Sequence, residues 1–348
     1  MNWPHRDTIA QGVADMLRVN MGLKSGERLL VMADVPRIQD WQAEIQAKLE
    51  EMLERAVLAR LVAEVAAERF PDCPVSWWPF PSTGRHGVEL DDASAARMCQ
   101  ADVVIAITSY SLSHTNARTA ANQAGARLAS MPEFDASMFA AGGPMAADYQ
   151  QIGADCRAFA ELLSAADQVR VCTSYGTDVR FRLGGRPGKI DAGLYTQPGI
   201  WGNLPAGEAF AIPLEGTGEG QLVAPAGWYP RLTEDMLFRI EQGVVVEVRG
   251  GGAVGDKYRA LLNLGSQDPA YQGRRNLAEL GVGTNPKARK PDNVLEAEKI
   301  KGTVHLAIGD NIHMGGQVEA DLHQDFVQPK PDLFLDGRAV IVGGEWRI

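Results

Sequence analysis

The stretch "ADVVIAITSYSLSHTNARTAANQAGARLASMP", residues 101–132, decides the fold class of the first part of the chain. It begins with a continuous apolar run, residues 101–109, which predicts a buried strand. A helical segment follows at 115–125, and a second strand is predicted at 126–132. Strands that read as unbroken apolar runs are typical of parallel sheets covered by helices on both faces. The order strand, helix, strand therefore predicts an α/β fold with an open, mostly parallel sheet.

The preceding residues extend this pattern towards the N-terminus. Residues 6–23 have the apolar spacing of an amphipathic helix, and "ERLLVMAD", residues 27–34, predicts another buried strand. Residues 41–70 are rich in Ala, Glu, Leu and Arg, which predicts one long helix. "CPVSWWPFP", residues 73–81, contains too many prolines for a central strand and predicts an edge strand or a loop. We expect the α/β domain to cover residues 1–160.

From about Val169 onward the sequence changes to many short strands separated by glycine turns. This pattern predicts a β-rich, barrel-like α+β domain over residues 161–348, with one helix near residues 256–264. One glycine motif in this part, Gly250, Gly252 and Gly255, has the GxGxxG spacing of a dinucleotide site. No second parallel strand is predicted after its helix, so we interpret the motif as a plain glycine turn.

Composition limits the partners of this chain of 348 residues. Its formal net charge of -10 argues against nucleic acid, because phosphate binding needs clustered Lys and Arg. No stretch approaches the roughly 18 apolar residues of a membrane span, and the first residues lack the apolar core of a secretory signal. The four cysteines form no CxxC pair, which is typical of free thiols in a reducing compartment. We therefore expect a cytoplasmic protein without nucleic-acid or membrane partners.

Half of the six histidines lie in "GTVHLAIGDNIHMGGQVEADLHQDF", residues 302–326. His323 and Asp325 are two positions apart, so on an extended segment both project from one face and could share a metal ion. His305 lies in another strand-like segment that could align beside them. A His-x-Asp pair is also common on protein surfaces, so the spacing alone leaves both interpretations open. His313, between "GDN" and "MGG", is predicted to lie in a loop.

Two carboxylates have apolar neighbours in the sequence. Glu208 lies in "NLPAGEAFAIPLEG" and Glu279 in "NLAELGVGTNP". A buried carboxylate must pair with a cation, bind a metal ion or stay protonated. Arg274 and Arg275 are possible partners for Glu279, whereas no local partner is evident for Glu208.

Several segments together resemble the aminopeptidase T family of thermophilic metallo-aminopeptidases. The resemblance covers roughly residues 100–340, and its segments are "SLSHTNARTAANQAGARLASMP", "GTDVRF", "GNLPAGEAFAIPLEGTGEG", "NLAELGVGTNPKA", "EAEKIKGTVHLAIGDN" and "LHQDFVQPKPDLFLDG". It implies a homodimer that hydrolyses small peptides or amides with two divalent ions, Zn, Co or Mn. The ligands that it implies are Glu208, Glu279, His305, His323 and Asp325.

The resemblance also implies catalytic roles, with one departure from the family pattern. A metal-bound hydroxide would attack the scissile carbonyl, and Glu208 or Glu279 would serve as proton acceptor. The family has a tyrosine seven positions after the histidine of "GTVH", where this chain has Ile312. The neighbouring His313 is the candidate replacement donor.

A more distant resemblance, to 2,5-dihydroxypyridine 5,6-dioxygenase, implies a different chemistry. It implies a single non-haem iron, Fe(II), held by the His-x-Asp pair and by a histidine at the position of Glu279. Two histidines and one carboxylate form the facial triad of such iron sites. Because this chain has Glu279 there and keeps His305 and Glu208 for a second ion, its ligand set favours hydrolysis. We therefore expect a metallo-aminopeptidase, with a ring-cleaving dioxygenase of a hydroxylated pyridine or similar aromatic as the alternative.

The matching segments contain other polar residues, for which we expect structural roles. His114 and Arg118, one helical turn apart, are predicted to cap and pack the first domain, although a substrate or subunit contact stays open. Asp178 and Arg186 are predicted to form hydrogen bonds within the β-rich domain. Trp201 is expected to line the pocket or to lie in a core or dimer contact.

Overall fold

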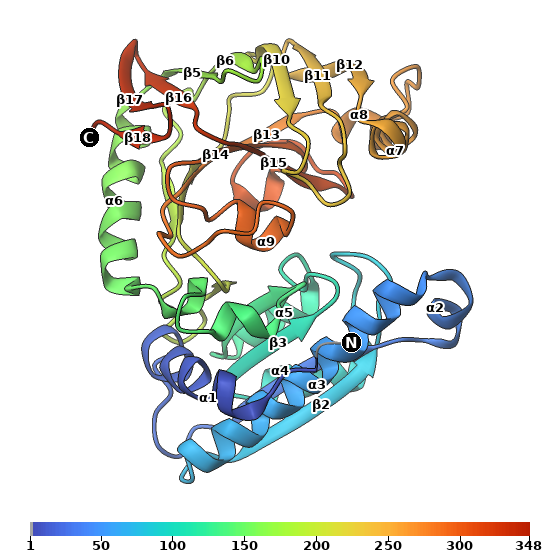
Figure 1. Ribbon diagram of the computed structural model, residues 1–348, viewed down its shortest axis with the longest axis vertical. Coiled ribbons are helices and arrows are strands. Elements are labelled where there is room, and N and C mark those ends of the chain that lie inside the picture. The colour runs from blue at the N-terminus through green and yellow to red at the C-terminus, as the bar shows by residue number, and fades with distance from the viewer. Residues whose placement is uncertain (1–2) are drawn as a thin grey trace. The chain divides into compact units, whose positions relative to one another are not determined.

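The computed structural model describes residues 3–348 and divides into two compact units. The first unit consists of the residues up to Tyr149 together with Gly193–Ala206. The second consists of Gln150–Ala192 and Gly207–Ile348 (Figure 1). Among the described residues, no helix combines the length and the apolar character needed to cross a bilayer.

The first unit is built on a parallel sheet of five strands, in the order β2-β1-β3-β4-β8. Its three inner strands β1, β3 and β4 are almost entirely buried, which is why they read as unbroken apolar runs in the sequence. The proline-rich strand β2 lies at the edge, as predicted. The strands are β1 Leu29–Val35, β2 Val75–Pro81, β3 Val103–Thr108, β4 Arg127–Pro132 and β8 Trp201–Asn203.

The helices of the first unit follow the predicted order, with one interruption. The single helix predicted over 41–70 is two, because Glu44 and Ile45 have extended backbone. Thr115 caps α5 by accepting a hydrogen bond from the backbone N–H of Arg118 at 3.1 Å. The helices are α1 Arg6–Asp15, continued by a π-helical turn over Met16–Asn20, α2 Ile38–Ala43, α3 Gln46–Arg69, α4 Asp92–Gln100 and α5 Asn116–Gln123, with 3-10 turns at Ala136–Phe139 and Pro144–Ala146.

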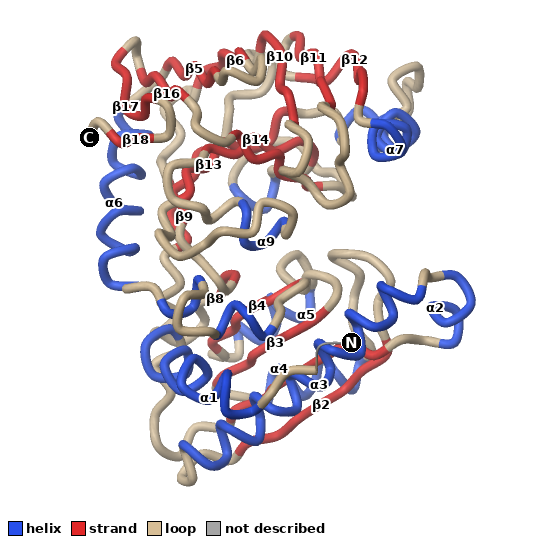
Figure 2. Tube along the Cα trace, in the orientation of Figure 1, coloured by secondary structure: helices blue, strands red, loops and turns tan. Residues whose placement is uncertain are grey.

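The second unit is β-rich and contains two antiparallel sheets, so the predicted fold class is confirmed (Figure 2). The eight-stranded sheet has the order β12-β11-β10-β6-β5-β16-β17-β18. Its strands are β5 Gln168–Cys172, β6 Asp178–Arg182, β10 Glu219–Ala224, β11 Met236–Glu241, β12 Val244–Gly250, β16 Asp332–Leu335, β17 Arg338–Val342 and β18 Glu345–Trp346.

The five-stranded sheet of the second unit has the order β15-β14-β13-β9-β7. Its strands are β7 Lys189–Asp191, β9 Glu208–Ala211, β13 Leu277–Gly283, β14 Val304–Gly309 and β15 His323–Gln328. The helices of this unit are α6 Tyr149–Ala165, α7 Gly252–Leu262, α8 Pro269–Gly273 and α9 Val294–Ala297, with a 3-10 turn η4 at Ile312–Met314.

The glycine motif before α7 is a turn and not a dinucleotide site. Gly250 ends strand β12, which pairs antiparallel with β11. Gly250, Gly251 and Gly252 have positive φ angles of 66°, 78° and 49°, which glycine adopts without strain. The parallel strand pair that a dinucleotide fold requires is therefore missing at this turn.

The five-stranded sheet has one apolar face and one polar face. Leu280, Val282, Leu306 and Phe326 project into a core that they share with residues of the eight-stranded sheet such as Phe238. Side chains alternate between the faces of a strand, so the residues between these positions project to the opposite face. That opposite face carries the acidic residues and histidines singled out above.

Candidate metal centre

Strand register brings the five predicted metal ligands to one face of the five-stranded sheet. Glu279 on β13 lies opposite Ala307 on β14, which in turn lies opposite Asp325 on β15. The same alignment pairs His305 with Gly281, His323 with Gly309, and Glu208 with Gly283. In an antiparallel pair, residues directly opposite each other project from the same face. Four strands that are far apart in the sequence thus supply one cluster.

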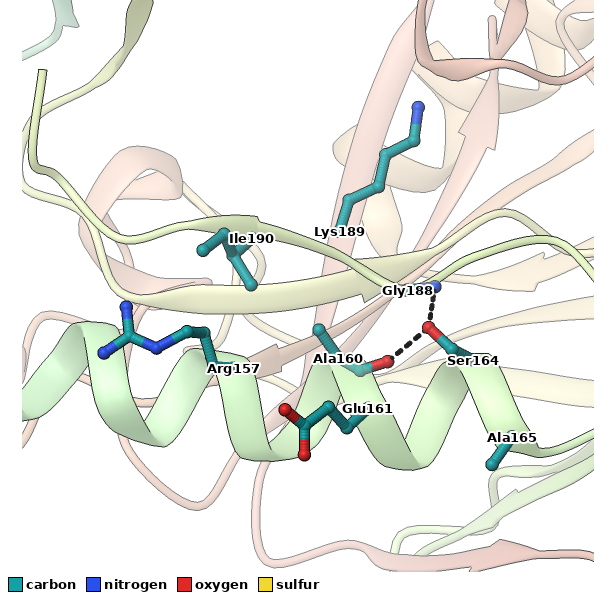
Figure 3. Close-up of a pocket in the computed structure, with 8 residues that line it drawn as sticks. All are labelled: Arg157, Ala160, Glu161, Ser164, Ala165, Gly188, Lys189 and Ile190. Carbon is teal, nitrogen blue, oxygen red and sulfur yellow. Dashed lines mark hydrogen bonds between the residues drawn. The ribbon is translucent and has the colours of Figure 1, made fainter. Parts of the chain in front are cut away.

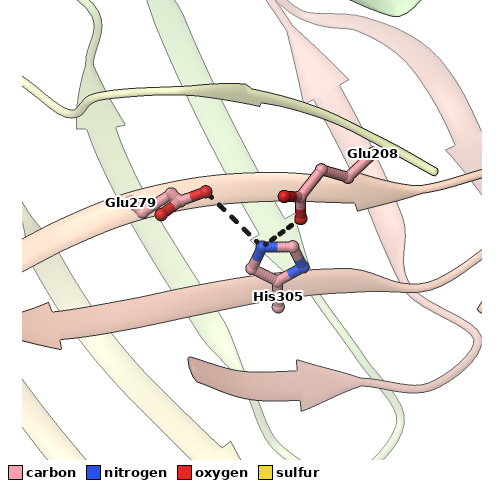
Figure 4. A group of neighbouring side chains, drawn as sticks. All are labelled: Glu208, Glu279 and His305. Carbon is pink, nitrogen blue, oxygen red and sulfur yellow. Dashed lines mark ion pairs between the residues drawn. The ribbon is translucent and has the colours of Figure 1, made fainter. Parts of the chain in front are cut away.

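The side chains of this cluster approach one another closely. Figure 4 shows the side chains of Glu208 and Glu279 pointing towards the ring of His305. Nε2 of His305 lies 3.4 Å from Oε2 of Glu208 and 3.6 Å from Oε1 of Glu279. Nε2 of His323 lies 3.2 Å from Oε2 of Glu279 and 3.6 Å from Oδ1 of Asp325. Glu279 therefore contacts one histidine with each of its two oxygens.

A backbone hydrogen bond fixes the orientation of His323. Its Nδ1 donates to the carbonyl oxygen of Asp310 at 2.8 Å. Nδ1 therefore carries a proton, and Nε2 points towards Glu279 and Asp325. Metal-binding histidines generally have such a partner on the other ring nitrogen. His323 is thus prepared to bind a metal ion through Nε2.

Two further charged residues belong to the cluster and were not predicted. Nζ of Lys299 lies 2.7 Å from Oε1 of Glu208 and 2.8 Å from Oε1 of Glu298. Both residues follow helix α9 in "EAEKIKG". Only 1% of the Lys299 side chain is exposed. Its sequence neighbours, which include charged residues, do not indicate that it is buried. Lys299 is the partner that the sequence did not reveal for Glu208.

Burial and mutual contact shift the pKa values of the cluster in opposite directions. Burial raises the pKa of Glu279, but hydrogen bonds from His305 and His323 outweigh it and lower the pKa to about 2. Burial lowers the pKa of His305, while contacts with Glu279, Glu208 and Asp325 raise it to about 9. Burial raises the pKa of Glu298 to about 8, although Lys299 opposes the shift. The cluster therefore holds protons that a bound cation would displace.

Other predictions for this unit have mixed outcomes. The proposed pairing of Glu279 with Arg274 or Arg275 is wrong: Arg274 pairs with Asp321 at 2.6 Å, and Arg275 donates to carbonyls that include that of Leu262 at 3.0 Å. Both arginines stabilise the segment before β13, and the carboxylate of Glu279 contacts His305 and His323 instead.

His313 lies on the 3-10 turn η4, outside the groups of potential metal ligands that the described residues form. Its side chain is 49% exposed, and Nδ1 lies 3.3 Å from Oδ2 of Asp310. The neighbouring Ile312 is also exposed, at 41%. The turn therefore directs both side chains towards solvent.

The predicted structural hydrogen bonds of Asp178 and Arg186 are confirmed. Asp178 accepts two hydrogen bonds from Arg170, at 2.9 and 2.8 Å. Arg186 donates to the carbonyl of Pro213 at 2.6 Å and to Glu215 at 2.5 Å.

His114, Arg118 and Trp201 belong to the first unit. The guanidinium of Arg118 lies 4.1 Å from the centroid of the Trp201 ring and donates to the carbonyl of Ser113 at 2.9 Å. The ring of His114 meets Trp201 edge-on, with centroids 6.4 Å apart. These contacts fit the predicted packing role of His114 and Arg118.

Figure 3 shows a surface hollow between helix α6 and strand β7, which is separate from the cluster. Its hydroxyl group, Ser164 Oγ, accepts from the backbone N–H of Gly188 at 2.8 Å and donates to the carbonyl of Ala160 at 2.7 Å. The residues that line it include none of the predicted metal ligands. The cluster on the sheet is therefore the stronger candidate site.

The residues of the cluster fit a divalent metal ion. Its potential ligand atoms converge in three overlapping groups, with atoms of each group within 4.8 Å of one another. The groups are Glu208, Glu279 and His305; Glu279, His323 and Asp325; and Glu298, His305 and Asp325. Carboxylate and imidazole ligands suit iron, zinc, manganese and cobalt alike. A bound cation would replace the protons that His305 and Glu298 hold in the cluster.

The family model described as 2,5-dihydroxypyridine 5,6-dioxygenase matches residues 21–347, nearly the whole chain. The chain belongs to the 2,5-dihydroxypyridine 5,6-dioxygenase family. A curated relative with that name, from Pseudomonas putida KT2440, is 26% identical over 198 residues, which are 53% of this chain and 55% of the relative. The matched stretch thus spans about half the length of that relative.

Two solved structures share the fold. The structure of 2,5-dihydroxypyridine dioxygenase from Pseudomonas putida KT2440 has a TM-score of 0.73 at 18% identity, covering 98% of this chain and 97% of the other. Wild-type AmpT from Thermus thermophilus has a TM-score of 0.62 at 14% identity, covering 99% of this chain and 100% of the other. At these identities the likeness shows the fold alone.

Membership of the 2,5-dihydroxypyridine 5,6-dioxygenase family corrects the predicted function. The family is one of enzymes, but the prediction of a hydrolase, and specifically a metallo-aminopeptidase or protease, is wrong. The error has a physical cause: the fold is shared with AmpT, and imidazole and carboxylate ligands serve hydrolytic and oxidative metals alike. The alternative, a ring-cleaving dioxygenase, agrees better with the family.

Proposed function

We propose that the chain is a ring-cleaving dioxygenase that acts on a hydroxylated pyridine or a similar hydroxylated aromatic ring. The match of the dioxygenase family model to residues 21–347 carries this proposal. The buried cluster supports it, because it provides ligands for a redox-active metal, which can activate dioxygen. Under this proposal the metal is ferrous iron, held by Glu279, His323 and Asp325.

When bound, ferrous iron would mediate the transfer of electrons from the aromatic ring to dioxygen, which do not react readily with each other. The chain itself supplies the ligands and their orientation. Asp310 fixes the ring of His323 through its carbonyl oxygen. Asp325 lies on the same strand two positions further, so both side chains are held by one rigid element.

Glu279 occupies the position at which the dioxygenase resemblance implies a histidine. The cluster nevertheless contains a second imidazole, that of His305, with Nε2 3.6 Å from Oε1 of Glu279. His305 is 1% exposed and lies between Glu279 and Glu208. Without a metal ion it holds a proton, because both neighbours stabilise its charged form.

The reaction balances without another co-substrate. Both atoms of one dioxygen molecule enter the opened ring, and the ring supplies the electrons, so no external reductant is consumed. The product is heavier than the substrate by two oxygen atoms.

Oxygen consumption by the iron-loaded protein tests the proposal. Apoprotein reconstituted with Fe²⁺ under anaerobic conditions is mixed with 2,5-dihydroxypyridine in air-saturated buffer. We expect equal molar consumption of dioxygen and substrate, and a ring-opened product in mass spectrometry. The His323→Ala variant, treated identically, is the matched control and should consume no oxygen. Absence of oxygen consumption across a panel of hydroxylated pyridines and hydroxylated benzenes would refute the proposal.

A further inference from the structure

The candidate ligands His323 and Asp325 lie at the start of an edge strand. Strand β15 is the last strand of the five-stranded sheet, and its neighbour in the sheet is β14. His323 is its first residue and directly follows the loop that begins at Asp310. The end of an edge strand opens more easily than the middle of a sheet, because fewer hydrogen bonds hold it. The geometry of these two ligands therefore depends on contacts that hold β15 from elsewhere.

Two tyrosines hold β15 from the apolar face of the sheet. Tyr258 lies on α7, and Tyr229 lies in the loop of residues 225–235 between β10 and β11. Both rings pack against Phe326, with centroids 5.4 Å away for Tyr258 and 5.7 Å away for Tyr229. The hydroxyl of Tyr229 donates to Oε1 of Gln324 at 3.1 Å. The tyrosine pair thus contacts the two residues of β15 that alternate with the ligands.

The hydrogen bonds of the tyrosine pair run in one direction, towards the ligand strand. The two hydroxyl oxygens lie 2.9 Å apart, and each hydroxyl has one proton to donate. Because Tyr229 donates its proton to Gln324, the proton between the two hydroxyls comes from Tyr258. Burial raises the pKa of Tyr258 well above its usual range, so this proton is retained. Gln324 in turn donates to the backbone carbonyl of Asp325 at 3.4 Å, so the chain of bonds ends at a candidate ligand.

The glycine turn before α7 brings Tyr258 to this position. A β-carbon at Gly255 would collide with the carbonyl oxygen of Gly250, at the end of β12. The glycine therefore lets the first turn of α7 lie close to the end of that strand. Tyr258 follows Gly255 by three positions, is 1% exposed and meets the ring of Phe238 edge-on at 5.8 Å. The glycine motif of the sequence thus serves to pack α7, and with it Tyr258, against the sheet.

We propose that Tyr229 is a positioning residue of the metal centre: through Gln324 it fixes the strand that carries His323 and Asp325. Without its hydroxyl, the buried hydroxyl of Tyr258 and Oε1 of Gln324 would each lose a partner, and unpaired buried polar groups favour a rearranged strand. Gln324 projects to the face opposite the ligands, so Tyr229 acts through the strand and not on the metal ion. The inference rests on the proposed function for the presence of a metal ion, and not for the reaction.

Metal binding by a variant without the Tyr229 hydroxyl tests the inference. Apoprotein is titrated with Mn²⁺ in a calorimeter, and with Co²⁺ while its visible absorption, which reports the ligand geometry around the ion, is recorded. We expect Tyr229→Phe to bind Mn²⁺ about 10-fold more weakly than the unmodified chain, a change typical for loss of an outer partner of a metal ligand. We also expect its Co²⁺ absorption bands to shift.

Tyr195→Phe is the matched control. It removes the hydroxyl of another buried tyrosine, which donates to the carbonyl of Asn203 in the first unit at 2.6 Å. Its thermal midpoint should fall, because a buried hydrogen bond is lost. Its Mn²⁺ affinity and Co²⁺ spectrum should equal those of the unmodified chain, which a role in general stability would not allow for Tyr229→Phe.

A double-mutant cycle shows whether Tyr229 acts through Gln324. Gln324→Leu removes the same hydrogen bond from the side of the strand, so the double variant should bind Mn²⁺ no more weakly than the weaker of the two single variants. Gln324→Leu also tests the inference by itself if Tyr229→Phe does not fold, since it should lower the affinity and shift the Co²⁺ bands in the same way.

Three results would overturn the inference: unchanged affinity and spectrum in folded Tyr229→Phe, additive losses in the double variant, or an equal loss of affinity in Tyr195→Phe. The expected affinities without any oxygen consumption on the substrate panel would refute the proposed function and leave the inference intact. An unmodified chain that binds neither Mn²⁺ nor Co²⁺ would overturn both.

Discussion

The imidazole of His305 lies in the space that a β-carbon at Gly281 would occupy. The two residues are directly opposite each other on β13 and β14, and a β-carbon built at Gly281 would collide with Cε1 and Nε2 of His305. The glycine therefore lets the ring lie flat across the neighbouring strand and reach Glu208 and Glu279. In "ELGVG", residues 279–283, the candidate ligand Glu279 and the glycine Gly281 are two positions apart and therefore share one face of the strand. Gly281 makes room for the ring of His305.

Substituting Gly281 should disturb the cluster specifically. In Gly281→Ala the new methyl group must displace His305, and overpacking of this kind typically costs about 1–3 kcal/mol of stability. We expect weaker Mn²⁺ binding by isothermal titration and a lower thermal midpoint. Gly265→Ala is the control, because a β-carbon there has no atom within 4 Å. Equal metal affinity in the two variants would argue against a role for the position of His305.

Removing the imidazole of His323 should abolish metal binding, whereas removing that of His313 should not. His323 faces Glu279 and Asp325, and its ring is held by the carbonyl of Asp310. His313 is half exposed and contacts the carboxylate of Asp310. Elemental analysis of His323→Ala and His313→Ala, purified in parallel, measures the difference. Retention of a full equivalent by His323→Ala would remove this histidine from the site.

The sequence predicted the helices and strands of this protein better than its reaction class. The apolar runs 27–34 and 101–109 became β1 and β3, because burial on both faces leaves a clear pattern. The break in the helix at Glu44 left no sequence pattern, because helix propensity is high on both sides of it. Strand β8 left none either, because three residues are too few to show a period.

In the candidate site, the residues that the sequence failed to predict are those whose position depends on contacts between distant parts of the chain. The spacing of His323 and Asp325 predicted that the two side chains share one face of a strand, and the register of β15 agrees. Lys299 was missed because its burial depends on packing against Asn285 and Glu208, which no local pattern encodes. The reaction class was wrong because the same ligand types suit a hydrolytic metal and iron.

Before a metal ion binds, the stability of the protein should fall as pH rises from about 6.5 to 9. The folded chain raises the pKa of His305 from 6.5 to about 9, so this residue contributes full stability below 6.5 and loses it as pH rises through 9. Glu298, whose burial raises its pKa to about 8, changes stability in the same direction, because a buried acid opposes ionisation.

Thermal midpoints of the apoprotein across this pH range measure the effect. Saturating Mn²⁺ should reverse the trend, because ligands must lose protons before they bind a metal ion. An apoprotein midpoint that rises between pH 6.5 and 9 would contradict the charge states assigned to the cluster.

The loop that orients His323 should also control metal affinity, through Glu215. Oε1 of Glu215 accepts from Nδ2 of Asn311 at 3.0 Å and from the backbone N–H of Gln317 at 2.9 Å, and Oε2 contacts Arg186. These bonds fix the loop that begins at Asp310, whose carbonyl holds the ring of His323.

In Glu215→Gln the charge that Arg186 needs is lost, and the loop should loosen. Loss of an outer partner of a metal ligand typically lowers metal affinity by about 10- to 100-fold. For Glu215→Gln we expect the Mn²⁺ affinity to fall by about 10-fold, the smaller of these changes. Asp178→Asn is the control, since it breaks a more exposed carboxylate–arginine pair, with Arg170, on the eight-stranded sheet. It should leave the Mn²⁺ affinity unchanged in the same titration. If both variants lose affinity equally, the effect is one of general stability, and the loop does not position His323.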